Sequence, residues 1–198
     1  QTGKIYAGAF DRFINFFKKM PLFALGEPEI EQFLLHLQHE GYSHSSINQH
    51  INAIKFYFEV VLGMPKRLYA LPRPRKKERL PEVLSKEEIS DMIALTDNIK
   101  HRLILSMLYG AGLRRSELLN FKVSDIDSKR MLLLIKNAKG GKDRQVMLGK
   151  PLLKLMRYYY KIYRPKHYLI EGKYRGKYSG SSVVRVVQRA AERAGIQR

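Results

Sequence analysis

The sequence has no cysteine among its 198 residues. This absence excludes a disulfide framework, a cysteine-ligated zinc site and a thiol nucleophile within these residues. Long apolar runs are missing as well, since no stretch approaches the ~20 apolar residues of a membrane span. No charged and then apolar leader opens the chain. We therefore expect no segment that spans a membrane. Because the histidines do not converge on metal-ligand spacing, we also expect no resident metal.

Acidic residues are scarce. The chain has 18 Asp and Glu against 37 Lys and Arg, a formal net charge of +19. Most of the excess positive charge lies in residues 129–198, which contain 19 basic and 3 acidic side chains. Charge of one sign destabilises a compact fold by self-repulsion, and phosphate backbones neutralise it with release of counterions. The composition favours a nucleic acid as partner. An anionic membrane surface, or charge that serves only solubility, is the alternative.

Residues 1–63 carry apolar side chains at three- and four-residue spacing, which predicts a small bundle of helices. Proline and an acidic side chain at the start of the second repeat suit the first turn of a helix. Glycine after the second and third repeats suits a helix end. The expected helices are 5–20 before Pro21, 27–40 before Gly41, and 45–62 before Gly63.

Residues 64–82 interrupt this periodicity with four prolines and seven Lys or Arg. Because X-Pro pairs favour extended backbone, we interpret this stretch as a basic linker between a domain at 1–63 and a domain at 83–198. The second domain opens with the spacing of a capping box at Ser85 and Glu88. Its pattern predicts a mainly α fold with a small β-hairpin or sheet. The expected elements are helices after Ser85 and at 100–109, 151–163 and 181–194, and strands at 131–135, 145–148 and 168–170.

Residues 103–127 (LILSMLYGAGLRRSELLNFKVSDID) are expected to carry the chemistry. A buried helix ends in a glycine turn and delivers Arg114 to the start of another short helix, with Glu117 three residues later. An arginine fixed at a turn beside a carboxylate suits a phosphate, because its planar fork matches two oxygens. The residues alone leave open an ordinary surface Arg–Glu pair, worth less than ~1 kcal/mol.

The stretch GAGLRRSELLNFKVSDID resembles the first-arginine motif of the tyrosine recombinases, the phage-integrase and Xer-type family. The family pattern is Gly-Leu-Arg, one free residue and Ser/Thr-Glu-Leu, with Asp-Ile some residues on; here the arginine is Arg114 and the acid Glu117. AKGGKDRQVMLG resembles the family's β-hairpin, whose tip lysine is Lys139 here. RPRKKERLPEVLSKEEI and HEGYSHSSINQHINAIKFYFEVVLG resemble the interdomain linker and the end of the helical core-binding domain. The resemblance covers nearly the whole chain.

The resemblance implies a SAM-like helical core-binding domain at 1–63, a linker at 64–82 and a C-terminally incomplete α/β catalytic domain at 83–198. It implies a site-specific recombinase or integrase that cleaves and rejoins DNA through a 3′-phosphotyrosyl intermediate, without metal or other cofactor. The implied partner is double-stranded DNA, with self-association on DNA as a synaptic tetramer of the full-length protein. The implied location is the cytoplasm, in a bacterium or with a phage or mobile element.

The resemblance also assigns roles to residues. Arg114 stabilises charge on the phosphate, Lys139 gives a proton to the departing 5′-oxygen, and Glu117 holds Arg114. Basic residues of the linker and hairpin are expected to contact DNA, as are polar residues of the third helix, where a solvated helix face is nearly as plausible. The DNA-binding candidates are Arg73, Arg75, Lys76, Lys77 and Arg79 in the linker, Lys142 and Arg144 in the hairpin, and Ser45, Asn48 and Lys55 in the helix.

The sequence departs from the family pattern in one respect. The family's His-x-x-Arg pair and nucleophilic tyrosine follow the last expected helix, and no His-x-x-Arg occurs in the 198 residues. Tyr158, Tyr159 and Tyr160 lie on an expected helix, where packing explains them better than nucleophilic roles. We therefore expect the chain alone not to cleave DNA. The alternatives are a catalytically inactive, truncated DNA-binding module that occupies recombination sites, and an RNA-binding protein, for which an RNP-like strand or KH-type loop is missing.

Overall fold

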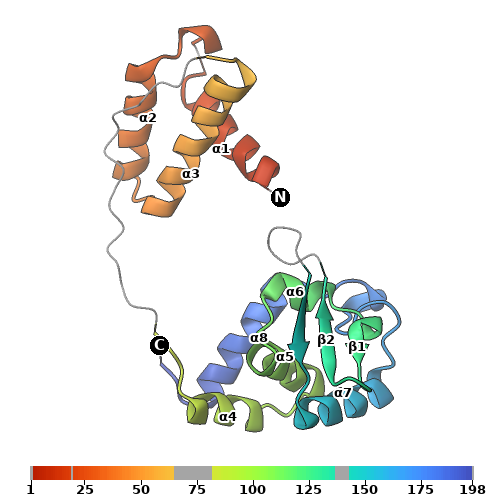
Figure 1. Cartoon of the computed structure of the whole chain (residues 1–198). Coiled ribbons are helices and arrows are strands. Elements are labelled where there is room, and N and C mark those ends of the chain that lie inside the picture. The colour runs from red at the N-terminus through yellow and green to blue at the C-terminus, as the bar shows by residue number, and fades with distance from the viewer. Residues whose placement is uncertain (1, 19, 65–81, 137–142, 198) are drawn as a thin grey trace. The chain divides into compact units, whose positions relative to one another are not determined.

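The computed structural model describes residues 2–18, 20–64, 82–136 and 143–197. The chain forms two compact units, Gln1–Leu80 and Pro81–Arg198, each with its own hydrophobic core. Figure 1 shows a helical first unit and a second unit in which a small sheet lies against one side of a group of helices. The predicted fold class, mainly α with a small antiparallel sheet, is confirmed. Most of the predicted linker lies outside the described residues.

The first unit is a helical bundle, and its long helices agree with the apolar spacing. In its core the rings of Phe13 and Phe33 meet edge to face, with centroids 5.3 Å apart. The Ser43 hydroxyl caps the third helix by accepting the Ser46 N–H at 3.2 Å. The third helix packs against both others. The helices are α1 (Thr2–Phe16), α2 (Glu27–His39) and α3 (His44–Lys55).

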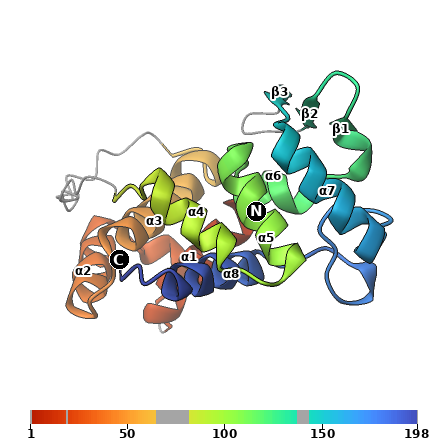
Figure 2. The same ribbon diagram turned by 90° about the horizontal axis from the view of Figure 1, so that it is seen from below.

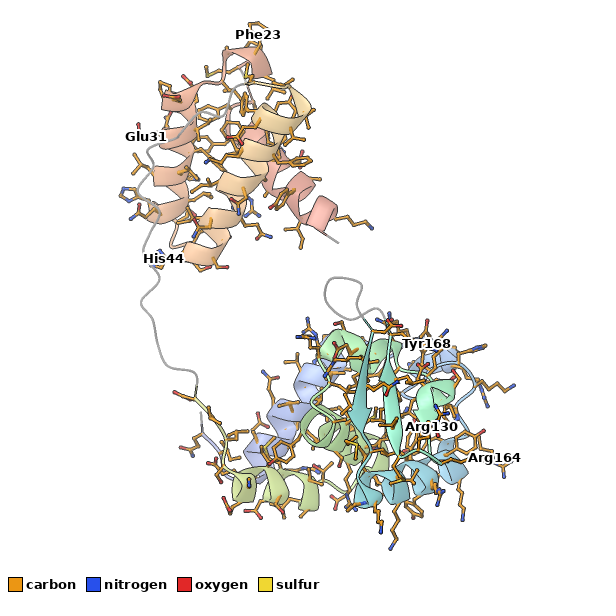
Figure 3. All side chains as sticks on the ribbon, viewed as in Figure 1. Phe23, Glu31, His44, Arg130, Arg164 and Tyr168 are labelled. Carbon is orange, nitrogen blue, oxygen red and sulfur yellow. The ribbon has the colours of Figure 1, made fainter. Side chains whose placement is uncertain are left out.

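Two details of the first unit differ from the sequence prediction. The helix α1 ends at Phe16, and the Phe17 N–H donates to the Ile14 carbonyl, three residues back where an α-helix has four. The helix α3 passes into a π-helical turn, η2 (Phe56–Val61), whose Phe58 still faces the core. The apolar spacing does not predict this widened turn, a rare element, in which Val60 and Val61 are exposed. Phe23, in the short 3₁₀ turn η1 (Leu22–Ala24), projects into solvent (Figure 3).

The second unit is organised around one central helix. The helix α5 contacts α4, α6, α7 and α8, and its Leu103, Ile104 and Met107 are fully buried. Figure 2 shows α5 lying among these helices. The capping box predicted at Ser85 is confirmed, because Ser85 and Glu88 exchange hydrogen bonds between side chain and backbone N–H. The helices are α4 (Lys86–Ala94), α5 (Ile99–Gly110), α6 (Arg115–Asn120), α7 (Lys150–Tyr163) and α8 (Gly180–Arg193).

The sheet of the second unit is antiparallel, with strand order β1-β2-β3. Its strands are β1 (Ile126–Asp127), β2 (Leu132–Ile135) and β3 (Arg144–Met147). Ile135 pairs with Arg144, and Leu133 with Val146. Leu133 and Ile135 are buried, as alternation along a half-buried strand requires. The predicted hairpin is thereby confirmed, while its tip at 137–142, with the candidates Lys139 and Lys142, lies outside the described residues.

The strand predicted at 168–170 is wrong. This run is a loop, although Leu169 and Ile170 are buried. The Leu169 N–H donates to the Phe121 carbonyl at 2.8 Å. The nearest β-contact is an isolated bridge between Glu171 and Lys177. A short apolar run signals burial without specifying a ladder partner.

Candidate functional site

Arg114 stands at the junction between α5 and α6. After α5 ends at Gly110, Gly112 adopts a φ of +56°, a left-handed conformation that glycine takes at little cost. Leu113 is buried in the core and fixes the turn. Arg114 itself is extended and directly precedes the first residue of α6. The predicted glycine turn therefore places the Arg114 side chain at the start of a helix.

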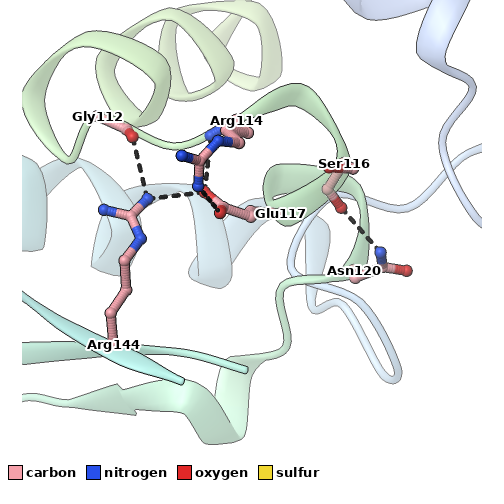
Figure 4. A network of polar contacts seen from close by, with 6 residues as sticks. All are labelled: Gly112, Arg114, Ser116, Glu117, Asn120 and Arg144. Atoms are coloured by element: carbon pink, nitrogen blue, oxygen red, sulfur yellow. Dashed lines mark hydrogen bonds and ion pairs between the residues drawn. The ribbon is translucent and has the colours of Figure 1, made fainter. Parts of the chain in front are cut away.

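The Glu117 carboxylate organises this turn, as Figure 4 shows. Its Oε2 accepts the Arg114 backbone N–H at 2.8 Å and the Arg144 Nη2 at 2.7 Å, and its Oε1 accepts the Arg114 Nη1 at 2.9 Å. Only 3% of the Glu117 side chain is exposed. Burial alone would raise the pKa of Glu117, but the hydrogen bonds from Arg114 and Arg144 outweigh it and hold the pKa below its ordinary value. Glu117 is therefore an ionised anchor shared by two arginines.

The two arginines differ in the exposure of their side chains and in the hydrogen bonds that their guanidinium groups already make. The Arg114 side chain is 57% exposed, and of its guanidinium only Nη1 is engaged within the described part of the chain. The Arg144 side chain is 37% exposed, and its Nη2 also donates to the Gly112 carbonyl at 3.1 Å. Arg114 therefore presents a held but open guanidinium to solvent, which is the geometry of an anion ligand.

A second buried carboxylate holds the other strand of the hairpin. Asp125 ends the 3₁₀ turn η3 (Val123–Asp125), and its side chain lies 2.8 Å from Lys136 Nζ, directly after β2. Its other oxygen accepts the Lys122 N–H at 3.0 Å. The sequence interpretation gave Asp125 no role of its own and missed Lys136. A usable signal was present, since a carboxylate beside an apolar residue, Ile126, in a strongly basic domain is expected to be paired where it is buried.

The predicted DNA contacts fall into three groups. On α3, Ser45 is exposed, whereas Asn48 and Lys55 are partly buried. Their spacing puts all three on one face of the helix. Arg144 is directed at Glu117. The remaining candidates lie outside the described residues: Arg73, Arg75, Lys76, Lys77, Arg79 and Lys142.

The three consecutive tyrosines of α7 behave as packing and surface residues. Tyr159 is buried and stacks on Tyr163, with ring centroids 4.6 Å apart. Burial raises the pKa of Tyr159 well above its ordinary value, which disfavours the phenolate. Tyr158 and Tyr160 are exposed. Among the described residues, no group of three or more His, Cys, Asp or Glu could hold a metal ion, and none of the described helices is long and apolar enough to cross a bilayer.

Comparison with known proteins identifies the family of this chain. The model of the phage integrase family matches residues 82–198, and that of the phage integrase N-terminal SAM-like domain matches residues 1–66. The chain belongs to the phage integrase family. The tyrosine recombinase XerA of Pyrococcus horikoshii is 35% identical over 169 residues, which are 83% of this chain and 59% of XerA. The chain spans 55–60% of the length of the first three curated relatives that it matches.

Solved structures show that the phage integrase fold is shared by the whole chain. The recombinase XerH bound to a difH substrate aligns with a TM-score of 0.78 at 20% identity, covering 98% of this chain and 64% of XerH. A lambda integrase tetramer bound to a Holliday junction aligns with a TM-score of 0.74 at 19% identity, covering 98% of this chain and 58% of that one. The predicted tyrosine recombinase family, with a SAM-like domain and part of a catalytic domain, is confirmed.

Proposed function

We propose that this chain binds double-stranded DNA and serves site-specific recombination, in which strands are cut and rejoined through a 3′-phosphotyrosyl intermediate. The observation that carries the proposal is the exposed Arg114 guanidinium, held by the buried, ionised Glu117. A charged donor fixed before the reaction stabilises the charge that develops on a phosphate without having to reorganise. Family membership adds the reaction in which such a donor is used.

The proposal gives three residues separate tasks. In the reaction a tyrosine hydroxyl gives up its proton to a base, its oxygen bonds to the phosphorus, the bond from phosphorus to the 5′-oxygen breaks, and the 5′-oxygen takes up a proton. Arg114 binds the non-bridging oxygens, Glu117 holds Arg114, and Lys139 gives the proton. Lys139 lies outside the described residues, but Lys136 before it and Arg144 after it are held by Asp125 and Glu117.

The proposal includes duplex DNA as partner, self-association on DNA and action in the cytoplasm, without metal or other cofactor. Contacts from the linker, the hairpin and the Ser45–Asn48–Lys55 face of α3 belong to it. The lambda integrase tetramer on a Holliday junction, which shares the fold, supports self-association. The strongly basic composition supports contacts with phosphates.

One observation favours a second candidate, a catalytically inactive module that occupies recombination sites. The 198 residues contain no His-x-x-Arg, the motif that pairs with the first arginine in this family. The encoding DNA beyond codon 198 separates the two. An open frame with His-x-x-Arg and a late tyrosine supports the recombinase, and its Arg114→Ala product should lose at least about a hundredfold in strand cleavage. A stop at codon 199 supports the module.

Binding by the 198-residue chain tests the phosphate contact directly. We expect Arg114→Gln to lower the slope of log affinity against log salt for duplex DNA by about one, because one phosphate contact is lost. Arg193→Gln is the control, since Arg193 is similarly exposed, at 54%, and lies at the end of α8. Fluorescence anisotropy of a labelled duplex at several salt concentrations measures both slopes. Equal slopes for wild type and Arg114→Gln would remove Arg114 from the DNA contacts.

A further inference from the structure

Arg144 ties together the two sides of the Arg114 turn. It begins β3, yet its Nη2 donates to the Glu117 carboxylate at 2.7 Å and to the Gly112 carbonyl at 3.1 Å. Gly112 precedes Arg114 in the chain and Glu117 follows it. One nitrogen of the hairpin therefore fixes the backbone before Arg114 and the acid that holds its guanidinium.

The donors of Arg144 are largely committed within the protein. A guanidinium has five N–H donors, one on Nε and two on each terminal nitrogen. Both acceptors of Nη2 belong to the protein. Nε is buried, with no hydrogen-bond partner among the described residues. Only Nη1 is left, so Arg144 cannot offer a phosphate the two-nitrogen fork that makes arginine an effective phosphate ligand.

The charge of Arg144 also matters to Glu117. A buried carboxylate that loses one of its cationic partners is left partly uncompensated, which is costly in a site with little water. Glu117 would then turn toward solvent or take up a proton. Either change removes or weakens its bond to Arg114 Nη1, which measures 2.9 Å here.

We infer that Arg144 is a positioning residue, which fixes the Arg114 guanidinium through Glu117 and does not itself bind DNA. This replaces the DNA contact expected for Arg144 from the sequence. The inference rests on the proposed function in treating Arg114 as the phosphate ligand. It also gives the hairpin a second task, because β3 then carries the residue that holds Arg114 in place.

Two variants of the 198-residue chain test this inference by NMR. Arg144→Gln removes one of the two arginine partners of Glu117, while the control Lys136→Gln removes a different ion pair of the same hairpin, with Asp125, and leaves Glu117 untouched. We measure the pKa of the Glu117 carboxyl and the order of the Arg114 Nε–H vector. In Arg144→Gln the pKa should rise and the Arg114 vector should lose order. In Lys136→Gln both should stay as in the wild type.

Duplex binding separates positioning from contact. In the Arg114→Gln background we expect the further change Arg144→Gln to leave the dissociation constant within about twofold and the salt slope unchanged, since a residue that acts only through Arg114 removes no further phosphate contact. A slope lower by about one would overturn the inference, as would an unchanged Glu117 pKa or an equally ordered Arg114. If Arg144→Gln fails to give a dispersed amide spectrum, Arg144→Met, which keeps most of the aliphatic stem, takes its place.

The experiments distinguish a failure of the proposed DNA-binding function from a failure of the inference about Arg144. If wild-type chain shows no salt-dependent binding to duplex DNA, DNA binding is refuted. The Glu117 and Arg114 measurements are made without DNA and still decide whether Arg144 acts through Glu117.

Discussion

The buried side chain of Glu117 binds three groups of the protein at once. It accepts the first N–H of the turn into α6, orients the Arg114 guanidinium and receives Arg144 from β3. A glutamine in its place would replace one carboxylate oxygen by an NH₂ group, which cannot accept a hydrogen bond. The N–H donors of Arg114 or Arg144 that face it would then lack an acceptor. Buried donors without acceptors cost about 1–3 kcal/mol each, more when charged. Glu117 is therefore as important for folding of the second unit as for the proposed chemistry.

The lowered pKa of Glu117 predicts a pH dependence of stability. The folded pKa lies below the ordinary glutamate value of about 4.3, so the contribution of the ionised carboxylate is fully present above that value. It is lost as the pH falls through the folded pKa. The difference in free energy of unfolding between wild type and Glu117→Gln should therefore shrink from pH 6 to pH 3. Urea denaturation at each pH measures it, and a constant difference would contradict the prediction.

At the residue scale, local contacts could be predicted and distant ones could not. Arg114 and Glu117 are three residues apart at a helix start, where side chains meet by geometry alone. Arg144 reaches Glu117 across 27 positions, so the contact depends on how β3 packs beside α6. Only the folded second unit brings them together.

At the scale of elements, α4 depends on a capping box at its first turn. Ser85 accepts the Glu88 N–H at 3.1 Å and gives its own N–H to the Glu88 carboxylate at 2.7 Å. Ser85→Ala should destabilise the first turn of α4 by about 1 kcal/mol. Because this raises the population of the open turn, its amides should exchange about fivefold faster. Residue-resolved hydrogen exchange measures this. Ser90→Ala, on an exposed face of the same helix, should change little, and equal effects in both variants would count against the cap.

Helices were easier to predict than the irregular segments of the second unit. Regular helices bury one face at a fixed period, and α5 and α7 lie within about a residue of the predicted limits. The two-residue strand β1 is too short to have a period. The run at 168–170 is apolar because Leu169 and Ile170 fill the core as a loop. Burial and strand pairing are separate properties, and the sequence reports mainly the first.

At the scale of the whole molecule, the net charge of +19 dominates association. Because each neutralised phosphate releases condensed counterions, affinity for duplex DNA should fall steeply with salt, with a log–log slope of several. Binding titrations between low and physiological salt measure the slope. A flat response would refute backbone binding. Single-stranded RNA that outcompetes duplex DNA at the same salt would favour the RNA-binding alternative.

The two ion pairs at the base of the hairpin also limit how this segment can vary in evolution. Lys136 and Arg144 are paired with Asp125 and Glu117, and the strands β2 and β3 on either side of the hairpin tip pair in a fixed register. A slip by one residue would turn Leu133 and Ile135 toward solvent and separate both charge pairs. We therefore expect an insertion or deletion between positions 136 and 144 to be tolerated better than one within β2 or β3. Such a change would leave both ion pairs, and the arginine held beside the hairpin, in their places.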